Sequence, residues 1–395
     1  MTNRIYLFAN FGDWKKQPYG GGEVGNRRTL QLLQKCGYEI KLIEKYQRVK
    51  NHSLPNKCLL LLKMISNICK FFFVLLFGRR KNSVVHIVGF YGPMVYFERI
   101  LVGVSKSLGY KTIYEMRGGG ADDYYAHGSE TYRCTFDSII KSCNCVFSQG
   151  IENYDLIDSI VVGKDKFYYP NYVMPDFVPS TYPIKPHNNI NLLYFGRISD
   201  TKNVDVVLKA MRILHEKYPQ TTLTIVGNHT DEKYYKSLLD YVAENGLSDC
   251  VMFHPACNHE QLKEYLKDKH FYLFPTSEPH EGHSNAMTEA MVWGLIPIAT
   301  PQGFNRSVVA NDGLIVRELS PKAFADCVSK VIDSKFVDKY SKDAYERVKE
   351  HYYSEMVRQN LQKKYDSLFN AYRNIMTDNK CIKPFMGGAW QRCNS

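Results

Sequence analysis

The sequence lacks several patterns that would place it in other protein classes. Its 11 cysteines are scattered without a C-x2-C pair, so neither a zinc module nor a disulfide framework is expected. It contains no base-reading motif of a nucleic-acid-binding domain and no Asp-x-Asp pair that would offer two carboxylates to a metal. The first residues, MTNRIYLFAN, lack the long apolar core of a signal peptide. We therefore expect a cytoplasmic protein with reduced thiols, no bound metal and no nucleic-acid partner.

Positive charge is concentrated near the start of the chain. The 395 residues carry 51 Lys and Arg against 40 Asp and Glu, a net charge of +11. Residues 1–100 alone hold 17 basic and 5 acidic side chains. The length suits two domains, and a hydrophobic content of 44% supports packed cores. We expect the basic first half to contact an anionic partner, either a phosphorylated acceptor or an anionic membrane surface.

The most informative stretch is Phe274–Pro301. The run FYLF before it predicts a buried strand, a polar loop follows, and Ser284 or Asn285 is a suitable N-cap for a helix that leads to the strand LIPIAT. Such a βαβ unit places its loop at the carboxyl edge of a parallel sheet, where ligands bind. Glu281 and Glu289 stand there with seven residues between them. A helix start binds phosphate and carboxylates accept hydrogen bonds from sugar hydroxyls, so a nucleotide sugar fits; the alternative is two solvated glutamates on a connecting loop.

This stretch, PTSEPHEGHSNAMTEAMVWGLIPIAT, resembles the Glu-x7-Glu signature of retaining glycosyltransferases of the GT-B fold, the "glycosyl transferases group 1" family. The resemblance implies that Glu281 contacts the donor sugar and that Glu289 binds the ribose hydroxyls. It also implies donor contacts along the intervening backbone, at Gly282, His283, Ser284 and Asn285. Many family members carry Phe and Gly where this chain has His283 and Ser284, so the sugar preference does not transfer.

A second candidate element begins at the strand INLLYFG. Gly196 opens the turn after it, and Arg197 and Lys202 follow before a helix. Two cations on a strand-to-helix loop suit a diphosphate, although such cations are often only solvated. The string resembles the family's G-R-x4-K motif, which implies that Arg197 and Lys202 neutralise the leaving nucleotide diphosphate while Glu281 completes the catalytic set. A donor bound in this way requires no cofactor beyond the nucleotide-diphosphate sugar itself.

The first strand, RIYLFAN, leads into a glycine-rich loop. Gly20, Gly22 and Gly25 match the spacing of a dinucleotide-binding fingerprint, with Glu44 near the position of its ribose-binding acid. That fingerprint requires its first glycine directly after the strand, whereas ten residues intervene here. The loop instead resembles the N-terminal G-G loop of the same family, and a plain turn is the remaining alternative. The resemblance implies donor contacts at Gly21 and Gly22 and candidate acceptor or phosphate contacts at Glu23 and Arg27.

Two further polar residues lie in or after apolar strands of the first half. His86 sits inside the strand SVVHIVG, where a single histidine is usually structural. Arg117 ends the next strand, at the position where many family members carry a catalytic-site histidine. An arginine is always charged and cannot act as an acid or base, but it can hold a phosphate. We count His86 and Arg117 as candidate acceptor or phosphate contacts, with a surface arginine as the alternative for Arg117.

The longest apolar run is Cys58–Lys81. Lys63, Asn67 and Lys70 lie along its middle at helical intervals, and basic residues flank both ends. This pattern favours an interfacial helix on an anionic membrane surface or a helix packed into the first domain, and it favours a transmembrane span least. The first alternative would make the protein peripheral on the inner face of the plasma membrane.

Alternation of strands and helices predicts two Rossmann-like α/β domains that face a cleft. We expect a GT-B fold with an acceptor domain at 1–175, a nucleotide-sugar domain at 186–350, a C-terminal helix at about 352–376 that crosses back to the first domain, and a poorly ordered tail at 377–395. The resemblance implies transfer of a sugar from a UDP- or GDP-sugar to a glycan or lipid-linked acceptor, in bacterial surface polysaccharide synthesis. The alternatives are a GT-B-fold sugar-nucleotide epimerase, an NAD-dependent oxidoreductase and a non-catalytic membrane-binding module.

Overall fold

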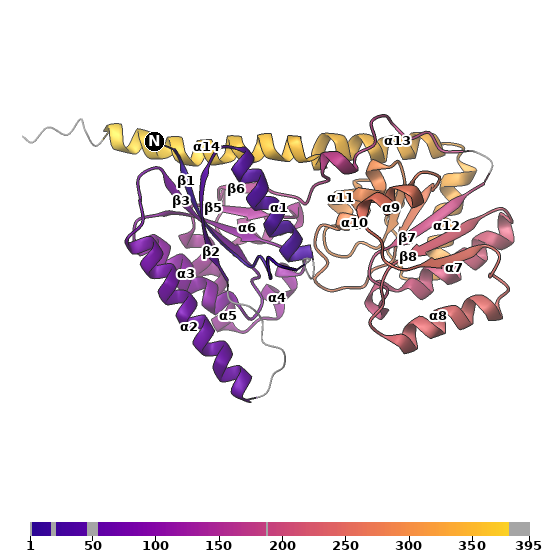
Figure 1. Cartoon of the computed structure of the whole chain (residues 1–395), viewed down its shortest axis with the longest axis horizontal. Coiled ribbons are helices and arrows are strands. Elements are labelled where there is room, and N and C mark those ends of the chain that lie inside the picture. The colour runs from indigo at the N-terminus through magenta and orange to yellow at the C-terminus, as the bar shows by residue number, and fades with distance from the viewer. Residues whose placement is uncertain (1, 17–20, 46–53, 187–188, 379–395) are drawn as a thin grey trace, which may run out of the picture.

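The first domain is built on a parallel sheet of six strands (Figure 1). The computed structural model describes residues 2–16, 21–45, 54–186 and 189–378, which leaves most of the predicted tail and Gly20 of the glycine loop outside the described residues. The strand order is β2-β1-β3-β4-β5-β6. The central strands are apolar and buried nearly throughout, as expected for strands covered on both faces. The six strands are β1 (Arg4–Ala9), β2 (Glu39–Glu44), β3 (Ser83–Gly89), β4 (Lys111–Met116), β5 (Cys145–Ser148) and β6 (Lys166–Tyr168).

The second domain is built on a parallel sheet of five strands in the order β11-β10-β7-β8-β9. The chain builds β7 to β9 in one direction and then places β10 and β11 on the other side of β7. The topological switch point therefore lies between β7 and β10, and ligands of open α/β sheets bind outside the carboxyl ends of such strands. The five strands are β7 (Asn191–Phe195), β8 (Thr222–Val226), β9 (Val251–His254), β10 (Phe271–Phe274) and β11 (Ile296–Ala299).

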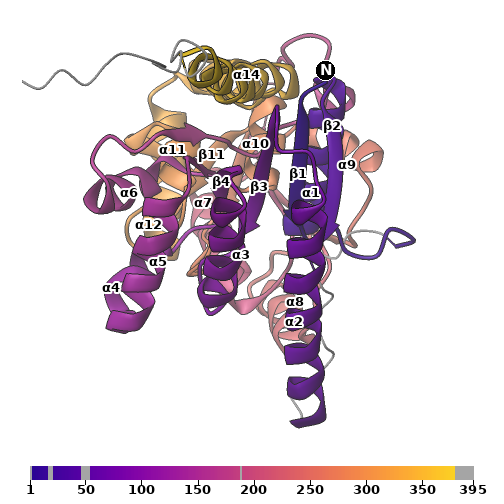
Figure 2. The same cartoon turned by 90° about the vertical axis from the view of Figure 1, so that its left-hand side faces the viewer.

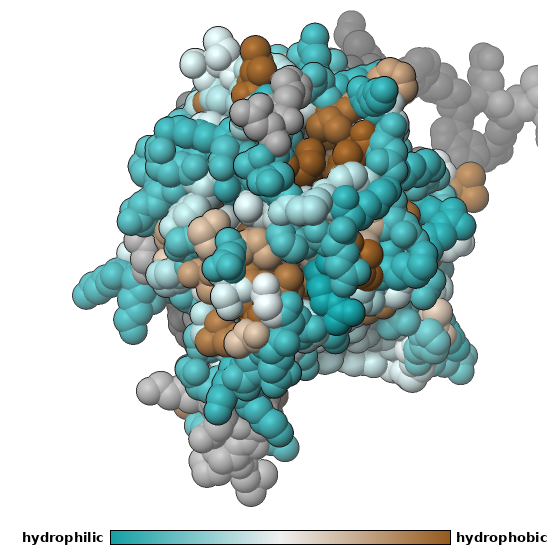
Figure 3. Space-filling view, turned by 90° about the vertical axis from the view of Figure 1, so that its right-hand side faces the viewer, coloured by the Kyte–Doolittle hydropathy of each residue, from teal (hydrophilic) through white to brown (hydrophobic). Residues whose placement is uncertain are grey.

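Helices connect the strands of both sheets. Those of the first domain are α1 (Gly21–Lys35), α2 (Leu54–Leu76), α3 (Val95–Ser107), α4 (Ala121–His127), α5 (Glu130–Ser142) and α6 (Tyr154–Ile160). Those of the second are α7 (Val204–Lys217), α8 (Glu232–Glu244), α9 (His259–Leu266), α10 (Asn285–Val292), α11 (Asn305–Val309), α12 (Pro321–Asp333) and α13 (Val337–Arg347). The outer end of the second domain presents a mainly hydrophilic surface (Figure 3).

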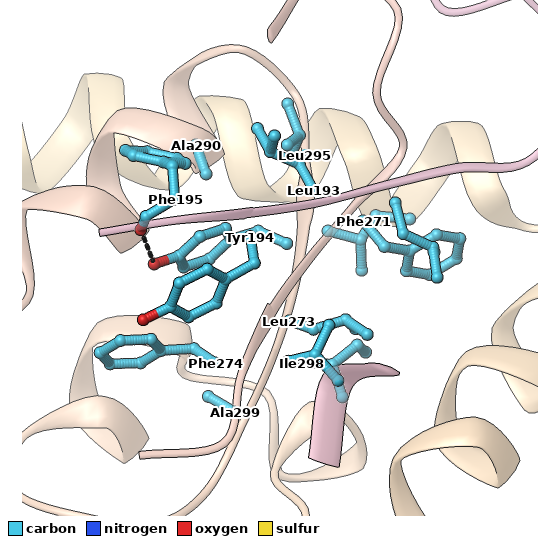
Figure 4. Packing of buried hydrophobic residues seen from close by; sticks show 14 of the residues in the cluster. Leu193, Tyr194, Phe195, Phe271, Leu273, Phe274, Ala290, Leu295, Ile298 and Ala299 are labelled. Atoms are coloured by element: carbon cyan, nitrogen blue, oxygen red, sulfur yellow. Dashed lines mark hydrogen bonds between the residues drawn. The ribbon is translucent and has the colours of Figure 1, made fainter. Parts of the chain in front are cut away.

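The core beneath the switch point is aromatic (Figure 4). Tyr194 and Phe195 of β7 lie beside Tyr272 and Phe274 of β10, and all four are buried. The Tyr272 hydroxyl donates a hydrogen bond to the Phe195 carbonyl over 3.0 Å, so this deeply placed polar group is satisfied. Close packing of these four side chains fixes the ends of β7 and β10, and with them the positions of the loops that follow.

The last helix, α14 (Ser354–Asp378), crosses from the second domain to the first (Figures 1 and 2). The helical run is interrupted at Tyr353, because this residue pairs with Val173, at the start of the predicted proline-rich linker Val173–Asn189. The Val173 N–H donates to the Tyr352 carbonyl, and the Val173 carbonyl accepts from the Ser354 N–H. The two chain crossings between the domains therefore lie side by side, and the predicted crossing helix is confirmed.

The predicted helix at 58–81 is present as α2, shifted toward the N-terminus. Within the described residues, Asn56–Leu76 is one helix long and apolar enough to cross a bilayer, with a mean hydropathy of 2.0 and only 17% of it buried. Its C-terminal half packs against the first domain through Phe71 and Leu75, which are fully buried. Its structure thus combines a core-packed stripe with a largely exposed surface.

Candidate functional site

The turn after β7 lies at the switch point and contains Gly196 and Arg197. Gly196 adopts φ +143° and donates its N–H to the Val226 carbonyl over 3.0 Å. A Cβ on Gly227 would stand 1.9 Å from the Gly196 carbonyl oxygen, so the neighbouring strand end must also be glycine. Arg197 follows with an exposed side chain that makes no hydrogen bond or ion pair within the described part of the chain. Its guanidinium is therefore available to a ligand.

Lys202 is held at the switch point by residues of the β10–α10 loop. It ends a short 3-10 turn, its residue is only 8% exposed, and its ammonium forms an ion pair with Glu281. The Thr276 hydroxyl lies 3.4 Å from the ammonium and 3.0 Å from the Glu281 carboxylate, so it hydrogen-bonds with both. The Phe274 ring closes one side, 5.2 Å from the ammonium. The structure thus brings together the predicted lysine and the first predicted glutamate.

The second predicted glutamate stands in α10. Ser284 caps this helix and accepts a hydrogen bond from the Met287 N–H over 3.3 Å. The Glu289 carboxylate is buried and lies 3.3 Å from His259 of α9 and 3.8 Å from Arg28 of α1. The hydrogen bond to Glu289 raises the pKa of His259 above its ordinary value. Sequence reasoning did not single out His259, since it belongs to no recognisable motif.

His283 does not present its ring to the cleft as a solvated group. The ring is buried, neither of its nitrogens has a hydrogen-bond partner among the described residues, and it contacts the Tyr352 ring at 4.7 Å. Burial, with a smaller contribution from Arg347, lowers the pKa of His283 to about 3. His283 is therefore neutral at physiological pH, and its ring packs against Tyr352, just before α14. We call the β10–α10 loop, which carries Glu281 and His283, the donor loop.

The peptide of His283 is bound by two amides of the first domain. Its N–H donates to the Gln149 side chain over 3.3 Å, and its carbonyl accepts from Asn171 over 2.7 Å. The two amides are themselves hydrogen-bonded over 2.8 Å. The backbone N–H of His283 therefore has a protein partner in this structure, and the donor contact expected at His283 stays a prediction. Gln149 directly follows β5 and Asn171 stands in the string PNYV, but only the fold shows that both reach the other domain.

A glycine loop of the first domain packs directly on the donor loop. A Cβ on Gly119 would stand 2.3 Å from the Glu281 carbonyl oxygen and 2.9 Å from the Gly303 Cα. A Cβ on Gly282 would meet the Gln149 side chain at 2.7 Å. Glycine is therefore required on both sides because the backbones of the two domains touch here. These contacts place the first domain against the loop that carries Glu281.

Arg117 and His86 belong to a buried charge cluster instead of a ligand-binding surface. The Arg117 guanidinium forms an ion pair with Glu115 and donates to Thr29 over 2.8 Å. His86 is fully buried, 2.7 Å from Glu115 and 2.6 Å from the Tyr365 hydroxyl of α14. Burial alone would raise the pKa of Glu115, but Arg117 and His86 outweigh it and lower this pKa to about 2. Both side chains thus have internal partners, and the acceptor or phosphate contacts expected at these two positions stay predictions.

The glycine loop of the first domain is organised by α1. Arg27 donates to the carbonyls of Phe11, Asp13 and Lys16 and so supports the loop, while its expected acceptor or phosphate contact stays a prediction. The Glu23 carboxylate lies beside Gly12, where an added Cβ would approach to 2.3 Å. Gly21 is exposed at the helix start, and an added Cβ there would meet nothing within 4 Å; the next residue, Gly22, is also exposed. Gly21 therefore faces open space, whereas a Cβ on Gly22 would meet the Phe90 ring at 4.0 Å.

The first domain has a groove of about 420 Å³. It lies at the carboxyl ends of β3 and β4, and three tyrosines dominate its lining: Tyr96, Tyr124 and Tyr132. The Tyr124 ring stacks on His280 of the donor loop, with centroids 4.9 Å apart. We call this feature the tyrosine groove. His280 directly precedes Glu281 in the chain, so the groove adjoins the donor loop.

Comparison with known proteins agrees with this geometry. Residues 183–351 match the family model described as "Glycosyl transferases group 1". A GDP-mannose:cellobiosyl-diphosphopolyprenol alpha-mannosyltransferase of Xanthomonas oryzae pv. oryzae is 32% identical over 139 residues, which is 35% of this chain and 36% of the relative. A lipopolysaccharide 1,2-N-acetylglucosaminetransferase of Salmonella typhimurium is 25% identical over 207 residues, 48% of this chain and 53% of the relative. The match thus spans about a third to a half of these relatives.

Solved structures share the fold over nearly the whole chain. Sucrose-phosphate synthase from Thermosynechococcus elongatus superposes with a TM-score of 0.68 at 18% identity, covering 93% of this chain and 100% of that one. The Anabaena protein HepE in complex with UDP gives 0.68 at 13% identity with the same coverage. The fold is therefore GT-B, as predicted. Residues 183–351 are similar to the group 1 glycosyltransferases.

Proposed function

We propose that the protein is a retaining glycosyltransferase that moves a sugar from a nucleoside-diphosphate sugar to a glycan or lipid-linked acceptor. The observation that carries the proposal is the ion pair of Lys202 with Glu281 at the switch point between β7 and β10, with the exposed Arg197 on the same loop after β7 as Lys202. A free guanidinium, a buried ammonium and a carboxylate match the diphosphate and hydroxyl groups of such a donor.

The proposed chemistry is electrostatic. As the bond between the sugar and the diphosphate breaks, negative charge grows on the leaving phosphate oxygens, and Arg197 and Lys202 stabilise it without a divalent metal. The N-terminus of α10 adds its backbone dipole. Glu281 accepts a hydrogen bond from a sugar hydroxyl, and Glu289 accepts from the ribose. Lys202 is preorganised for this task, because Thr276 and Glu281 already fix its position.

We assign the acceptor to the tyrosine groove of the first domain. Aromatic faces pack against the apolar faces of sugar rings, and polar groups such as Asp123 and His127 at the groove can orient hydroxyls. The Xanthomonas relative is named for a GDP-mannose donor and a diphosphopolyprenol-linked acceptor, and the HepE structure holds UDP. These names support a GDP- or UDP-sugar donor and a lipid-linked acceptor. The proposal extends to an acceptor of surface polysaccharide synthesis, used at the cytoplasmic side of the membrane.

The test is transfer from a panel of UDP-, GDP-, ADP- and CDP-sugars, with the anomeric configuration of the product read by NMR. One donor should give a product that retains the donor's anomeric configuration. Lys202→Ala should reduce turnover by about 10² to 10³-fold, whereas Lys209→Ala, on the exposed face of α7, should not. Inversion at the anomeric carbon would refute the retaining mechanism. A new sugar nucleotide formed from donor alone would favour an epimerase.

A further inference from the structure

Helix α2 carries a second surface that the donor and acceptor sites do not use. In two views at right angles its N-terminal end extends beyond the helices packed beside it (Figures 1 and 2). One stripe faces the first domain, since Asn67, Phe71 and Leu75 are buried at intervals of four residues. Asn67 also donates to the Glu44 carbonyl over 2.9 Å. This stripe fixes the orientation of the helix on the domain.

The opposite face is apolar and exposed. Residues of a helix follow each other at about 100°, so Leu62, Ile65 and Phe73 project away from the buried stripe. Leu62 is 64% exposed and Phe73 53% exposed. We call this surface the outer face of α2 and define it by Leu59, Leu61, Leu62, Ile65, Phe73 and Phe77. It contrasts with the mainly hydrophilic end of the second domain (Figure 3). Contiguous apolar surface of this kind marks an interaction site.

Charge on α2 and on the residues that flank it in the sequence has one sign. The sequence contains no Asp or Glu between Glu44 and Glu98. Six basic residues lie on or just after α2, namely Lys57, Lys63, Lys70, Arg79, Arg80 and Lys81. Exposed apolar side chains with basic residues at their border match the boundary between phosphate headgroups and acyl chains.

We propose that the outer face of α2 docks onto a bilayer surface that contains anionic lipid, with the helix lying along the surface. The apolar side chains enter the acyl boundary while the lysines and arginines contact lipid phosphates. The helix does not span the bilayer, because this would withdraw Phe71 and Leu75 from the core of the first domain and leave Lys63 and Lys70 in hydrocarbon. A second copy of the chain does not fit, because a symmetric contact would bring like charges together.

The test is flotation of the whole chain with vesicles of phosphatidylcholine, with and without phosphatidylglycerol. The protein should float with anionic vesicles, less so at high salt, and poorly with neutral vesicles. The double variant Leu62→Gln/Phe73→Gln should bind at least about tenfold more weakly, since burial of both side chains is lost. The matched control is Phe336→Gln, which alters a side chain of the second domain that is 60% exposed and should bind like the unchanged protein.

Three results would overturn the proposal. They are no flotation of the unchanged protein, equal flotation of the double variant, or dimers that the double variant converts to monomers while vesicles bind neither form. The inference does not depend on the proposed function, because α2 lies outside the donor crevice. Thermal shifts with UDP and GDP should be the same for the double variant and the unchanged protein, so failure of one proposal can be told from failure of the other.

Discussion

Lys202 and Glu281 form a buried ion pair, and we assign the same two residues to catalysis. Their side chains are 10% and 12% exposed, so each charge depends on the other for compensation. Removing one member of such a buried pair leaves an uncompensated charge, whereas replacing both with apolar residues is often neutral for stability. We also assign both residues to binding of the donor. Stability and turnover should therefore respond differently to single and double replacement of the pair.

We therefore predict that Lys202→Ala lowers the free energy of unfolding by about 3 kcal/mol, near the lower end measured for broken buried pairs. The double variant Lys202→Met/Glu281→Met should recover most of that stability but not turnover. Urea denaturation and initial-rate assays measure the two quantities on the same samples. Recovery of both stability and turnover would show that the pair has only a structural role.

His283 gives a pH dependence with a defined sign. An unfolded chain binds a proton at this side chain near its ordinary pKa of 6.5, whereas the folded protein does so only near 3. The unfolded state therefore binds more protons between these values, and stability falls as the pH drops below 6.5. His283→Phe removes this contribution, so its melting temperature should fall less than that of the unchanged protein between about pH 7 and about pH 5.

The control for this comparison is His127→Phe, which alters a side chain that is 80% exposed and should leave the pH profile unchanged. Parallel profiles for His283→Phe and the unchanged protein would contradict the account, because they would mean that the buried ring does not resist protonation.

At the scale of elements, two loops from different domains meet at the donor site. The Gly118–Gly120 loop follows β4, and the loop with Glu281 follows β10. Their backbones approach so closely that the first needs glycine at position 119. Gln149 and Asn171 hydrogen-bond to the backbone of His283, two residues after Glu281 in the same loop. The donor loop is therefore shaped by the first domain as well as by its own.

We predict that Gly119→Ala lowers turnover strongly with little loss of stability in either domain. A Cβ at 2.3 Å from the Glu281 carbonyl oxygen must push the loops apart and so displace the glutamate to which we assign a catalytic role. Gly103→Ala in α3 is a suitable control, because its Cβ meets only the end of the Arg99 side chain. Turnover equal to the control would show that the loops do not need this contact.

The sequence supports prediction of some elements better than others. Strands such as FYLF and INLLYFG are short, continuous apolar runs, so their positions are confirmed within a residue. The pairing of Lys202 with Glu281 follows from strand order, since both loops leave neighbouring parallel strands. By contrast, the sequence does not show that Arg117 and His86 have internal partners. Arg117 meets Glu115, and His86 meets Tyr365 of α14, only in the fold.

Contacts between domains were beyond prediction for the same reason. Gln149 and Asn171 are ordinary polar residues at strand ends, and no local pattern shows that they bind a peptide more than a hundred residues away. Burial of the His283 ring also depends on Tyr352, which reaches it from the segment before α14. Local periodicity predicts elements, whereas these interactions depend on how two completed domains meet.

At the scale of the whole molecule, α14 joins the two domains. It begins where Val173 and Tyr353 pair, and it then packs along the first domain, with Leu361 and Tyr365 fully buried. The Tyr365 hydroxyl reaches His86 in the middle of the first sheet. The first domain is therefore completed by a segment that follows the second domain in sequence.

We predict that Leu361→Ala destabilises the first domain by about 2–5 kcal/mol, the range for deletion of a buried leucine side chain. Met356→Ala on the same helix is the control, because Met356 is 37% exposed. Denaturant unfolding followed by tyrosine fluorescence measures the difference. Equal midpoints for both variants would show that α14 is not part of the domain's core.

The central claim is that the crevice between β7 and β10 binds a nucleoside diphosphate through Arg197 and Lys202. Calorimetric titration of the whole chain with UDP, GDP and NAD tests it most directly. The account predicts that UDP or GDP binds and NAD does not, and that Arg197→Ala/Lys202→Ala weakens binding by at least about a hundredfold, because two charge-assisted contacts are lost. Unchanged affinity in the double variant, or binding of NAD in place of both nucleotides, would contradict it.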